Sequence, residues 1–475
     1  MSKPSAGSPD RSIMKIALAS LAGSSIEWYD FFLYGTAAGL VFPTLFFPKD
    51  LPPLVAQIAA YATFAVGFIA RPVGGVVFGH YGDKLGRKPM LVIAMMMMGA
   101  GTTLIGLMPS YAQIGVAAPI ALVVLRFIQG FAVGGQWGGA VLLITETAPV
   151  ARRGYFGGYA QAGVPVGVLL ANLIFLAVTA TVAPAAFQAW GWRIPFLSSI
   201  ALIGIALYVQ LKLEDTPAFR ELEELKNARD DAIIARAAAV RGVTVEAVKA
   251  ELALVKKRSP VLEVIRTYPK EILLAAGAFI AVNGNFYIFI AFVLAYGTKF
   301  LHLPQQSMLL AVMIAALVMI PAIIFFSALS DRFGRRGLYL IGAAIMAAWS
   351  LAVFPMMDTK SLPLITLAIG GGLVITAIMY GPQAAFYSEI FTTKVRYSGA
   401  SLGYQIGAIF GGGMAPIVAT ALLQHYNSGT SIGVYMAILS VITFVSVFLL
   451  RETRGANMDE ALITVEGPEA QAPVA

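Results

Sequence analysis

The chain has 475 residues, of which 58% are hydrophobic and only 12% are charged. A soluble globular protein of this length needs far more polar surface, so the composition indicates a polytopic membrane protein. The sequence has no cysteine and only three scattered histidines, which excludes disulfides and thiolate chemistry, and we expect no metal site and no cofactor. The net charge of +8 would suggest nucleic acid binding in a soluble protein, but basic loops on one side of a membrane explain it better, so we expect no nucleic acid partner.

The chain begins with a polar tail, residues 1–13, for which we expect no fixed structure. The apolar run that follows is long enough to cross about 30 Å of hydrocarbon at 1.5 Å per residue. Because Glu27 and Asp30 lie inside this run without a small-residue cleavage site, we expect a retained helix and not a signal peptide. Residues 14–213 hold six such spans, at about 14–44, 54–78, 90–108, 117–145, 155–180 and 192–213.

The composition changes abruptly in residues 214–268. This segment holds ten Lys and Arg and ten Asp and Glu, so we expect it to lie in water, on the cytoplasmic side. Thr216 and Pro217 predict one helix start, and Gly242 followed by Thr244 predicts a stop and a second start. A charged helical linker between two bundles is the simpler interpretation, and a regulatory docking site is the alternative.

A second set of six spans fills residues 269–450, and residues 451–475 form a polar tail. The spans lie at about 269–297, 306–328, 338–357, 361–388, 397–421 and 430–450. An even number of spans places both termini on one side of the membrane. Lysine and arginine are concentrated in the loops on that side, so we expect both termini in the cytoplasm.

Two loop motifs repeat between the halves of the chain. GHYGDKLGRKPML (79–91) separates the second and third spans, and SALSDRFGRRGLYL (327–340) is a looser copy between the eighth and ninth. The matched residues are Asp83 and Arg87 in the first copy and Asp331 and Arg335 in the second, an offset of 248 residues.

A second motif repeats at an offset of 243 residues. Glu146 lies seven residues before Arg153, and Glu389 lies seven residues before Arg396. Two repeated motifs at nearly the same offset indicate two homologous halves.

The loop pattern G-x-x-x-D-[RK]-x-G-R-[KR] between two apolar spans resembles the loop between the second and third helices of the major facilitator superfamily. Three further segments, EWYDFFLYG (27–35), RPVGG (71–75) and LRFIQGFAVGGQWGGA (125–140), resemble its metabolite:proton symporter branch, which includes shikimate, dicarboxylate and osmolyte transporters. The resemblance covers most of residues 14–450. It implies an all-α membrane protein with twelve transmembrane helices in two pseudo-symmetric six-helix bundles, working by alternating access.

The resemblance also implies a gate. In the superfamily the loop aspartate caps the N-terminus of the eleventh helix across the two halves, and in this chain that helix is expected to begin near Tyr397. A helix N-terminus favours an anion by about 0.3 to 1 kcal/mol, which is enough to bias a two-state equilibrium. The expected gating residues are Asp83, Arg87, Asp331, Arg335, Glu146, Arg153, Glu389 and Arg396.

Ionisable side chains inside the spans carry the strongest functional signal, because each costs about 2.5 to 3.5 kcal/mol in hydrocarbon. Glu27 and Asp30 share one face of the first helix, and Tyr34 continues that face. Counting about 1.5 Å per residue places Arg126 of the fourth span at the same depth as Glu27. We therefore predict a midplane charge cluster in which Asp30 carries the proton and Glu27 is the partner of Arg126.

Two other interpretations concern these charges. The cluster could be a closed ion pair that only locks two helices together. Arg71 lies nearer the cytoplasmic end of its predicted span, so we expect it to snorkel or to pair with a loop acid.

A substrate site is expected beside the cluster. The guanidinium of Arg126 offers five donors in a fixed fork that suits a carboxylate. The second half has no charged residue inside its predicted spans but offers amides and phenols, each of which could instead be a packing residue. The predicted substrate-binding residues are Arg126, Tyr34, Gln129, Gln136, Tyr287, Tyr380, Gln383 and Tyr404.

These features predict a secondary active transporter of the bacterial inner membrane that moves a small organic acid, shikimate-like or a dicarboxylate, together with protons. The expected partners are the substrate, protons and the lipid bilayer, and we expect a monomer. A zwitterionic osmolyte such as proline or betaine is the alternative substrate, and a receptor or sensor without net transport is the alternative function. An enzyme would need a nucleophile, a metal set or a cofactor motif, and the sequence shows none.

Overall fold

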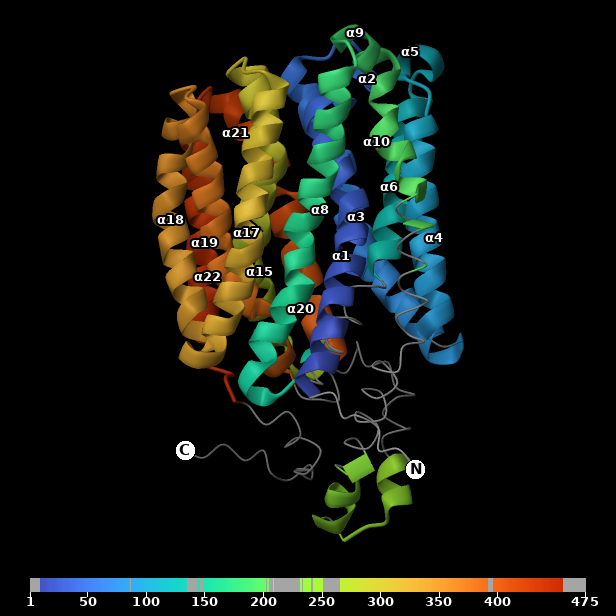
Figure 1. Cartoon of the computed structure of the whole chain (residues 1–475), viewed down its shortest axis with the longest axis vertical. Coiled ribbons are helices and arrows are strands. Elements are labelled where there is room, and N and C mark those ends of the chain that lie inside the picture. The colour runs from blue at the N-terminus through green and yellow to red at the C-terminus, as the bar shows by residue number, and fades with distance from the viewer. Residues whose placement is uncertain are drawn as a thin grey trace.

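The protein is a bundle of long helices whose axes lie nearly parallel, with the chain running up and down in alternation (Figure 1). The computed structural model describes residues 9–85, 87–134, 144–145, 148–201, 203–204, 208, 231–232, 234–240, 242–250, 265–391 and 396–455. Within these ranges the secondary structure is helical and contains no strand. The predicted all-α architecture is therefore confirmed.

The first half supplies six of the twelve transmembrane segments. The long helices are α1 (Pro9–Leu40), α3 (Pro53–Leu85), α4 (Arg87–Leu107), α6 (Ala117–Gly134) and α8 (Arg153–Thr181), and α10 (Arg193–Leu197) begins the sixth segment. Short elements join them: α2 (Phe42–Leu45), α5 (Tyr111–Ile114), the turn Val150–Arg152, α9 (Pro184–Ala186) and the π-turn Phe187–Gly191.

The second half supplies the other six. Its first segment is α15 (Pro269–Tyr287), the π-turn Ile288–Phe292, α16 (Val293–Ala295) and the π-turn Tyr296–Phe300. It is followed by α17 (Gln305–Phe333), α18 (Arg335–Asp358), α19 (Leu362–Ile390), then α20 (Arg396–Ala408), the π-turn Ile409–Gly413 and α21 (Ala415–Tyr426) as one segment, and α22 (Gly429–Leu449).

Nine of these segments are long and apolar enough, within the described residues, to cross a membrane. Helices α1 and α4 and the partly described sixth segment complete the set of twelve. Most predicted spans match the observed helices closely, with two departures. Helix α1 begins at Pro9, inside the tail that was expected to lack fixed structure, and α3 continues to Leu85, well past the apolar run that was predicted to end at residue 78. The last part of the fourth predicted span and most of the sixth lie outside the described residues.

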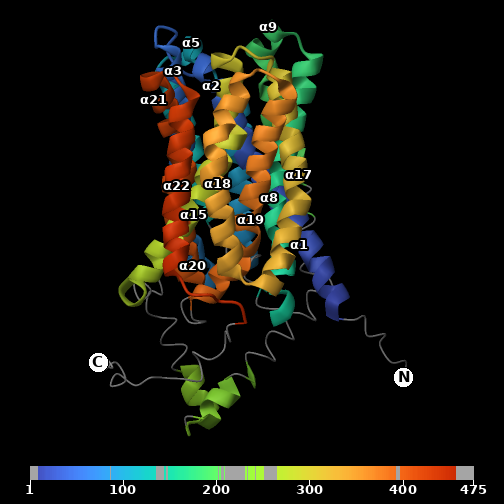
Figure 2. The ribbon, with the colours of Figure 1, turned by 90° about the vertical axis from the view of Figure 1, so that its left-hand side faces the viewer.

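The two halves pack against each other mainly through α8 and α3 of the first half, and α8 also contacts α19. Helix α8 lies along α17, and α3 packs against α20, α21 and the π-turn between them. Figure 2 shows α8 beside α17 and α18 beside α22. Helix α1 begins and α22 ends at the same end of the bundle, which is at the bottom of Figure 1 and which we call the lower end.

The charged linker forms helices where the sequence predicts them. Gly242 has a φ of +66°, the left-handed conformation that glycine adopts most easily, and Val243 N–H donates to the carbonyl oxygen of Ala238 at 3.1 Å. The next helix begins after Thr244, whose hydroxyl oxygen accepts the N–H of Ala247 at 3.2 Å. The predicted stop and second start are thus confirmed, whereas the first predicted start lies outside the described residues.

A residue after α22, Glu452, caps the N-terminus of α18. The carboxylate of Glu452 accepts the backbone N–H groups of Arg335 and Arg336 at 2.9 and 3.0 Å, and also those of Thr453 and Arg454. Partial burial by itself would raise the pKa of Glu452, but these four donors outweigh it and hold the pKa below the ordinary value of 4.5. A helix N-terminus stabilises such a carboxylate through its free N–H groups and its dipole.

We expect Glu452→Gln to lower the melting temperature of the purified protein by about 1 to 2 °C at pH 7. Because the folded-state pKa is lowered, the stabilisation is present above the ordinary pKa and is lost as the pH falls through the folded value. The difference between the two proteins should therefore shrink when melting is measured at pH 4 and below. A difference that stays the same from pH 7 to pH 4 would show that the carboxylate charge is not responsible.

Candidate functional site

Arg126 lies at the centre of the bundle inside a group of aromatic rings. It is fully buried on α6, and its guanidinium carbon lies 4.1 Å from the ring centre of Phe31, 4.3 Å from that of Tyr34 and 4.7 Å from that of Phe64. These distances are those of cation–π contacts, which strengthen when water is excluded. The predicted residue Tyr34 therefore supports Arg126, and its hydroxyl donates to Thr63 Oγ1 at 2.7 Å.

The polar contacts of Arg126 leave one edge of its guanidinium unused. Nη1 donates to Gln129 Oε1 at 3.3 Å. Nε and Nη2 have no hydrogen-bond partner in the described part of the chain. These two nitrogens form the side-on edge of the guanidinium, which can bind both oxygens of one carboxylate.

Asp30 is buried on α1, close to the hydroxyl groups of Thr102 and Ser199. Neither of its carboxylate oxygens has a hydrogen bond of good geometry within the described ranges. Gln129 connects it indirectly with Arg126, since Gln129 Nε2 donates to Thr102 Oγ1 at 2.7 Å. The structure thus brings Asp30 and Arg126 into one polar group, joined by Gln129 and Thr102 and not by a direct ion pair. The side chain of Glu27 lies outside the described residues.

Arg71 belongs to the same centre, and the expectation that it snorkels or pairs with a loop acid is wrong. The side chain is only 2% exposed, and its guanidinium carbon lies 4.2 Å from the ring centre of Phe31 and 4.6 Å from that of Phe68. The depth of Arg71 follows from the length of α3. Because this helix runs on to Leu85, 14 residues or about 21 Å of helix separate Arg71 from its end.

The second half contributes phenols to this centre. Tyr287 is an electrostatic neighbour of both Arg71 and Arg126, and the ring of Tyr404 stacks on Phe279 with 4.1 Å between ring centres. A cavity of about 20 Å³, enough for roughly one water molecule, lies between the halves. Its lining includes Trp28, Phe32, Asn283, Tyr287, Tyr380 and Tyr404.

The remaining predicted binding residues have different positions. Gln383 is fully buried on α19, and neither its amide oxygen nor its amide nitrogen has a partner among the described residues. Gln129 positions Arg126, as described above. Gln136 lies outside the described residues. The predicted set therefore divides into cavity-lining phenols, supports of Arg126 and one buried amide.

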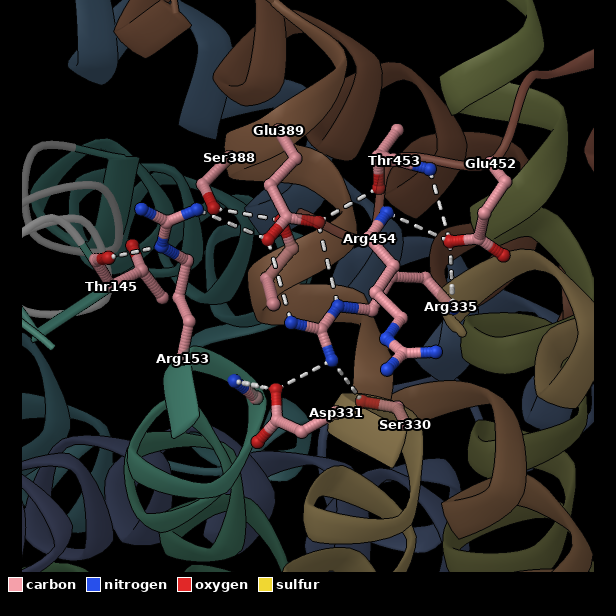
Figure 3. Close-up of polar contacts among 12 residues, drawn as sticks. Thr145, Arg153, Ser330, Asp331, Arg335, Ser388, Glu389, Glu452, Thr453 and Arg454 are labelled. Carbon is pink, nitrogen blue, oxygen red and sulfur yellow. Dashed lines mark hydrogen bonds and ion pairs between the residues drawn. The ribbon is translucent and has the colours of Figure 1, made fainter. Parts of the chain in front are cut away.

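Four of the predicted gating residues meet at the lower end (Figure 3). Arg153 of the first half contacts Glu389 of the second, with 3.3 Å between Nη1 and Oε1. Arg335 contacts the same carboxylate, with 3.4 Å between Nε and Oε2, and Thr453 Oγ1 donates to it at 2.8 Å. One buried carboxylate therefore joins two arginines from different halves of the chain.

Asp331 makes a second link between the halves. Its two carboxylate oxygens each accept a backbone N–H at 2.8 Å, from Gly154 and from Tyr155, at the start of α8. It also pairs with Arg335, 2.7 Å away. This is the capping of a helix across the two halves that the sequence predicts for the other copy, at Asp83. The side chains of Asp83, Arg87, Glu146 and Arg396 lie outside the described residues.

The opposite, upper end also joins the halves. The hydroxyl of Tyr61 donates to the carbonyl oxygen of Ala291 at 3.0 Å, and Lys299 Nζ donates to Gln57 Oε1 at 2.6 Å. With links at both ends and a very small central cavity, the described residues form an occluded arrangement.

In comparisons with known proteins, the chain is similar to membrane transporters. The sequence pattern of the family described as Sugar (and other) transporter matches residues 15–462. The chain is 36% identical to the inner membrane metabolite transport protein YhjE of Escherichia coli K12, covering 95% of this chain and 97% of the relative. It is 36% identical to the shikimate transporter of the same organism, with 93% and 95% covered, and 31% identical to its proline/betaine transporter, with 94% and 84% covered.

Solved structures show the same fold. The proton:xylose symporter XylE, a protein of the major facilitator superfamily, superposes with a TM-score of 0.69 at 19% identity, covering 96% of this chain and 100% of that chain. A partially occluded, inward-open structure of XylE from E. coli gives a TM-score of 0.68.

Gly67 provides the space that Arg126 occupies. A Cβ at this position would lie 2.7 Å from Arg126 Nε and 3.1 Å from its guanidinium carbon, so we expect Gly67→Ala to displace the guanidinium from its rings. Uptake of the transported solute should fall at least about tenfold, since a misplaced binding group costs about this much or more. Gly337→Ala is the matched control because a Cβ there meets nothing within 4 Å. Equal uptake by the two variants would contradict a functional role for the position of Arg126.

Glu389 should hold the lower end closed. Removing one member of a buried ion network costs about 3 kcal/mol or more, so Glu389→Gln should favour separation of α8 from the second half at this end about 100-fold. The chain has no cysteine, so a single Ser327→Cys change, where α17 packs against Gly158 of α8, provides a clean reporter. Maleimide labelling of the reporter should accelerate in Glu389→Gln and stay slow in Asp231→Asn, which breaks an exposed ion pair in the linker. Slow labelling in both variants would contradict the gating role.

Proposed function

Because the chain belongs to the sugar (and other) transporter family of the major facilitator superfamily, we propose that this multi-pass membrane transporter moves small organic acids together with protons. The observation that carries this proposal is the side-on edge of Arg126, buried among aromatic rings and unpartnered within the described residues. A buried charge is costly unless it is paired, so this edge favours a substrate with a carboxylate. Similarity to a shikimate transporter and to a metabolite transport protein supports the same class of solute.

Proton coupling is assigned to the carboxyl groups of α1. Asp30 is buried without a cationic partner in the described structure, and taking up a proton removes the penalty of burying its charge. Thr102 and Gln129 connect the Asp30 carboxyl group with Arg126. Protonation of Asp30 therefore changes the electrostatic environment of the arginine that binds the substrate. Glu27, one turn away on α1, is the second candidate. The proton:xylose symporter with the same fold supports this type of coupling.

Transport requires the two ends to open in turn. We place the lower end in the cytoplasm, because the sequence concentrates Lys and Arg there. Opening that end requires the contacts of Glu389 and Asp331 with the first half to break, and opening the other requires Tyr61 and Lys299 to release their partners. These links are few and polar, so the two open states can lie close in energy.

A zwitterionic osmolyte is the second candidate, supported by 31% identity to a proline/betaine transporter. Its quaternary or secondary ammonium group would need aromatic faces or an acid to bind. The rings around the centre, such as Phe31, already contact two arginine cations, which would repel a third positive charge. This arrangement favours an anion.

Proton coupling by Asp30 and substrate binding by Arg126 can be tested separately in proteoliposomes. Asp30→Asn should lose accumulation driven by a proton gradient but retain exchange of preloaded substrate, because exchange needs no proton release. Arg126→Lys keeps the charge but loses the planar fork, and should raise the substrate concentration for half-maximal exchange by about 10-fold or more. Asp50→Asn, at an exposed position, is the matched control.

The same assay contains the outcome that contradicts the proposal. If Asp30→Asn and Glu27→Gln both accumulate organic acids like the unchanged protein, these carboxyl groups do not couple proton movement to transport. If the unchanged protein exchanges proline or betaine but no organic acid across the panel, the osmolyte function is correct.

A further inference from the structure

The centre of the bundle holds two buried guanidinium groups at close range. Those of Arg71 and Arg126 lie 4.2 and 4.1 Å from the same ring centre, that of Phe31. The two carbons can therefore be no more than 8.3 Å apart, the sum of these distances. Neither residue forms an ion pair within the described residues, and Arg71 is among the electrostatic neighbours of Arg126.

Both guanidinium groups leave the same atoms unused. In Arg71, as in Arg126, Nε and Nη2 have no hydrogen-bond partner within the described residues, while the side chain is at least 98% buried. Each arginine thus offers one complete side-on edge, which matches the two oxygens of a carboxylate. Tyr287, which lines the central cavity, is an electrostatic neighbour of both arginines.

We propose that the substrate is a short dicarboxylate, with one carboxylate bound by Arg126 and the other by Arg71. This inference rests on the proposed organic acid transport and narrows its substrate class. Two like charges held this close in a water-poor site repel each other, and a dianion neutralises both. A monocarboxylate would leave one buried guanidinium unpaired, so the site discriminates against it through the group that it fails to neutralise.

The other two buried arginines of the described structure are not available for this role. Arg153 and Arg335 are both engaged with Glu389 at the lower end, and Lys299 donates to Gln57 at the upper end. Asp30 does not occupy either edge, since neither of its carboxylate oxygens has a hydrogen-bond partner among the described residues. The pair on the ring of Phe31 is therefore the arrangement that fits two carboxylates of one small molecule.

The test compares diacids with their monoamides, in which an amide of nearly the same shape replaces one carboxylate. Succinate and 2-oxoglutarate are measured against their monoamides, with shikimate as a hydroxylated monocarboxylate, by inhibition of substrate exchange and by thermal shift of the purified protein. The unchanged protein should bind a diacid at least about 30-fold more tightly than its monoamide, the size expected when one buried charge loses its partner. Arg71→Gln should bring this ratio to about one while binding of the monoamide changes little.

Two further variants test whether a lost preference for the diacid comes only from damage to the structure. Arg71→Lys keeps a positive charge and should retain part of the preference for the diacid, whereas Arg266→Gln, at an exposed position outside the bundle, should keep all of it. If Arg71→Gln fails to fold, the ratio in the unchanged protein and in Arg71→Lys still decides the question.

Three results would overturn the inference. Equal binding of diacid and monoamide by the unchanged protein, tight binding of shikimate without binding of either diacid, or a loss in Arg71→Gln that is equal for diacid and monoamide would each show that Arg71 does not bind a second carboxylate. If the unchanged protein binds and exchanges no acid at all, the proposed function fails together with the inference, and this result is distinct from the other three.

Discussion

The contact of two arginine side chains with the ring of Phe31 is the constraint on which the centre of this structure depends. Holding two buried cations near one ring requires α3 and α6 to approach α1 and each other closely. Glycines make this approach possible: a Cβ on Gly130 would lie 2.6 Å from the Cα of Gly67, and one on Gly134 would lie 2.0 Å from the carbonyl oxygen of Arg71. Small residues at helix interfaces commonly permit such backbone contact in membrane proteins.

At the lower end, buried charges are paired with each other, and the pairs join the two halves of the chain. Glu389 at the end of α19 binds Arg153 at the start of α8, and further up the same helices Gln161 Nε2 donates to the carbonyl oxygen of Tyr380 at 3.3 Å. Tyr380 also lines the central cavity. Helix α19 therefore contacts both the central cavity and the charged contacts at the lower end.

The internal repeat gives the two loops matching chemistry. Asp331 accepts two backbone N–H groups at the start of α8. The side chain of its counterpart Asp83 lies outside the described residues, so its capping of the eleventh helix stays a prediction. The pairing of Arg153 with Glu389 likewise joins residues of the two repeated motifs, one from each half. Such exchanged contacts between repeats are suited to a protein in which one half rocks against the other.

The sequence by itself determined the membrane-spanning, all-α twelve-helix fold, and its repeated motifs singled out Arg153, Asp331, Arg335 and Glu389, which the structure brings into contact. These follow from apolar length, charge placement and local motif spacing, which are properties of neighbouring residues. It also identified Arg126, because a charge deep in an apolar run is costly and so stands out. Only the tertiary structure decided that Arg71 joins Arg126, since the depth of a side chain depends on where its helix ends and which ring faces it. The pairing of α1, α3 and α6 around Phe31 is a contact between distant segments, and no local pattern encodes it.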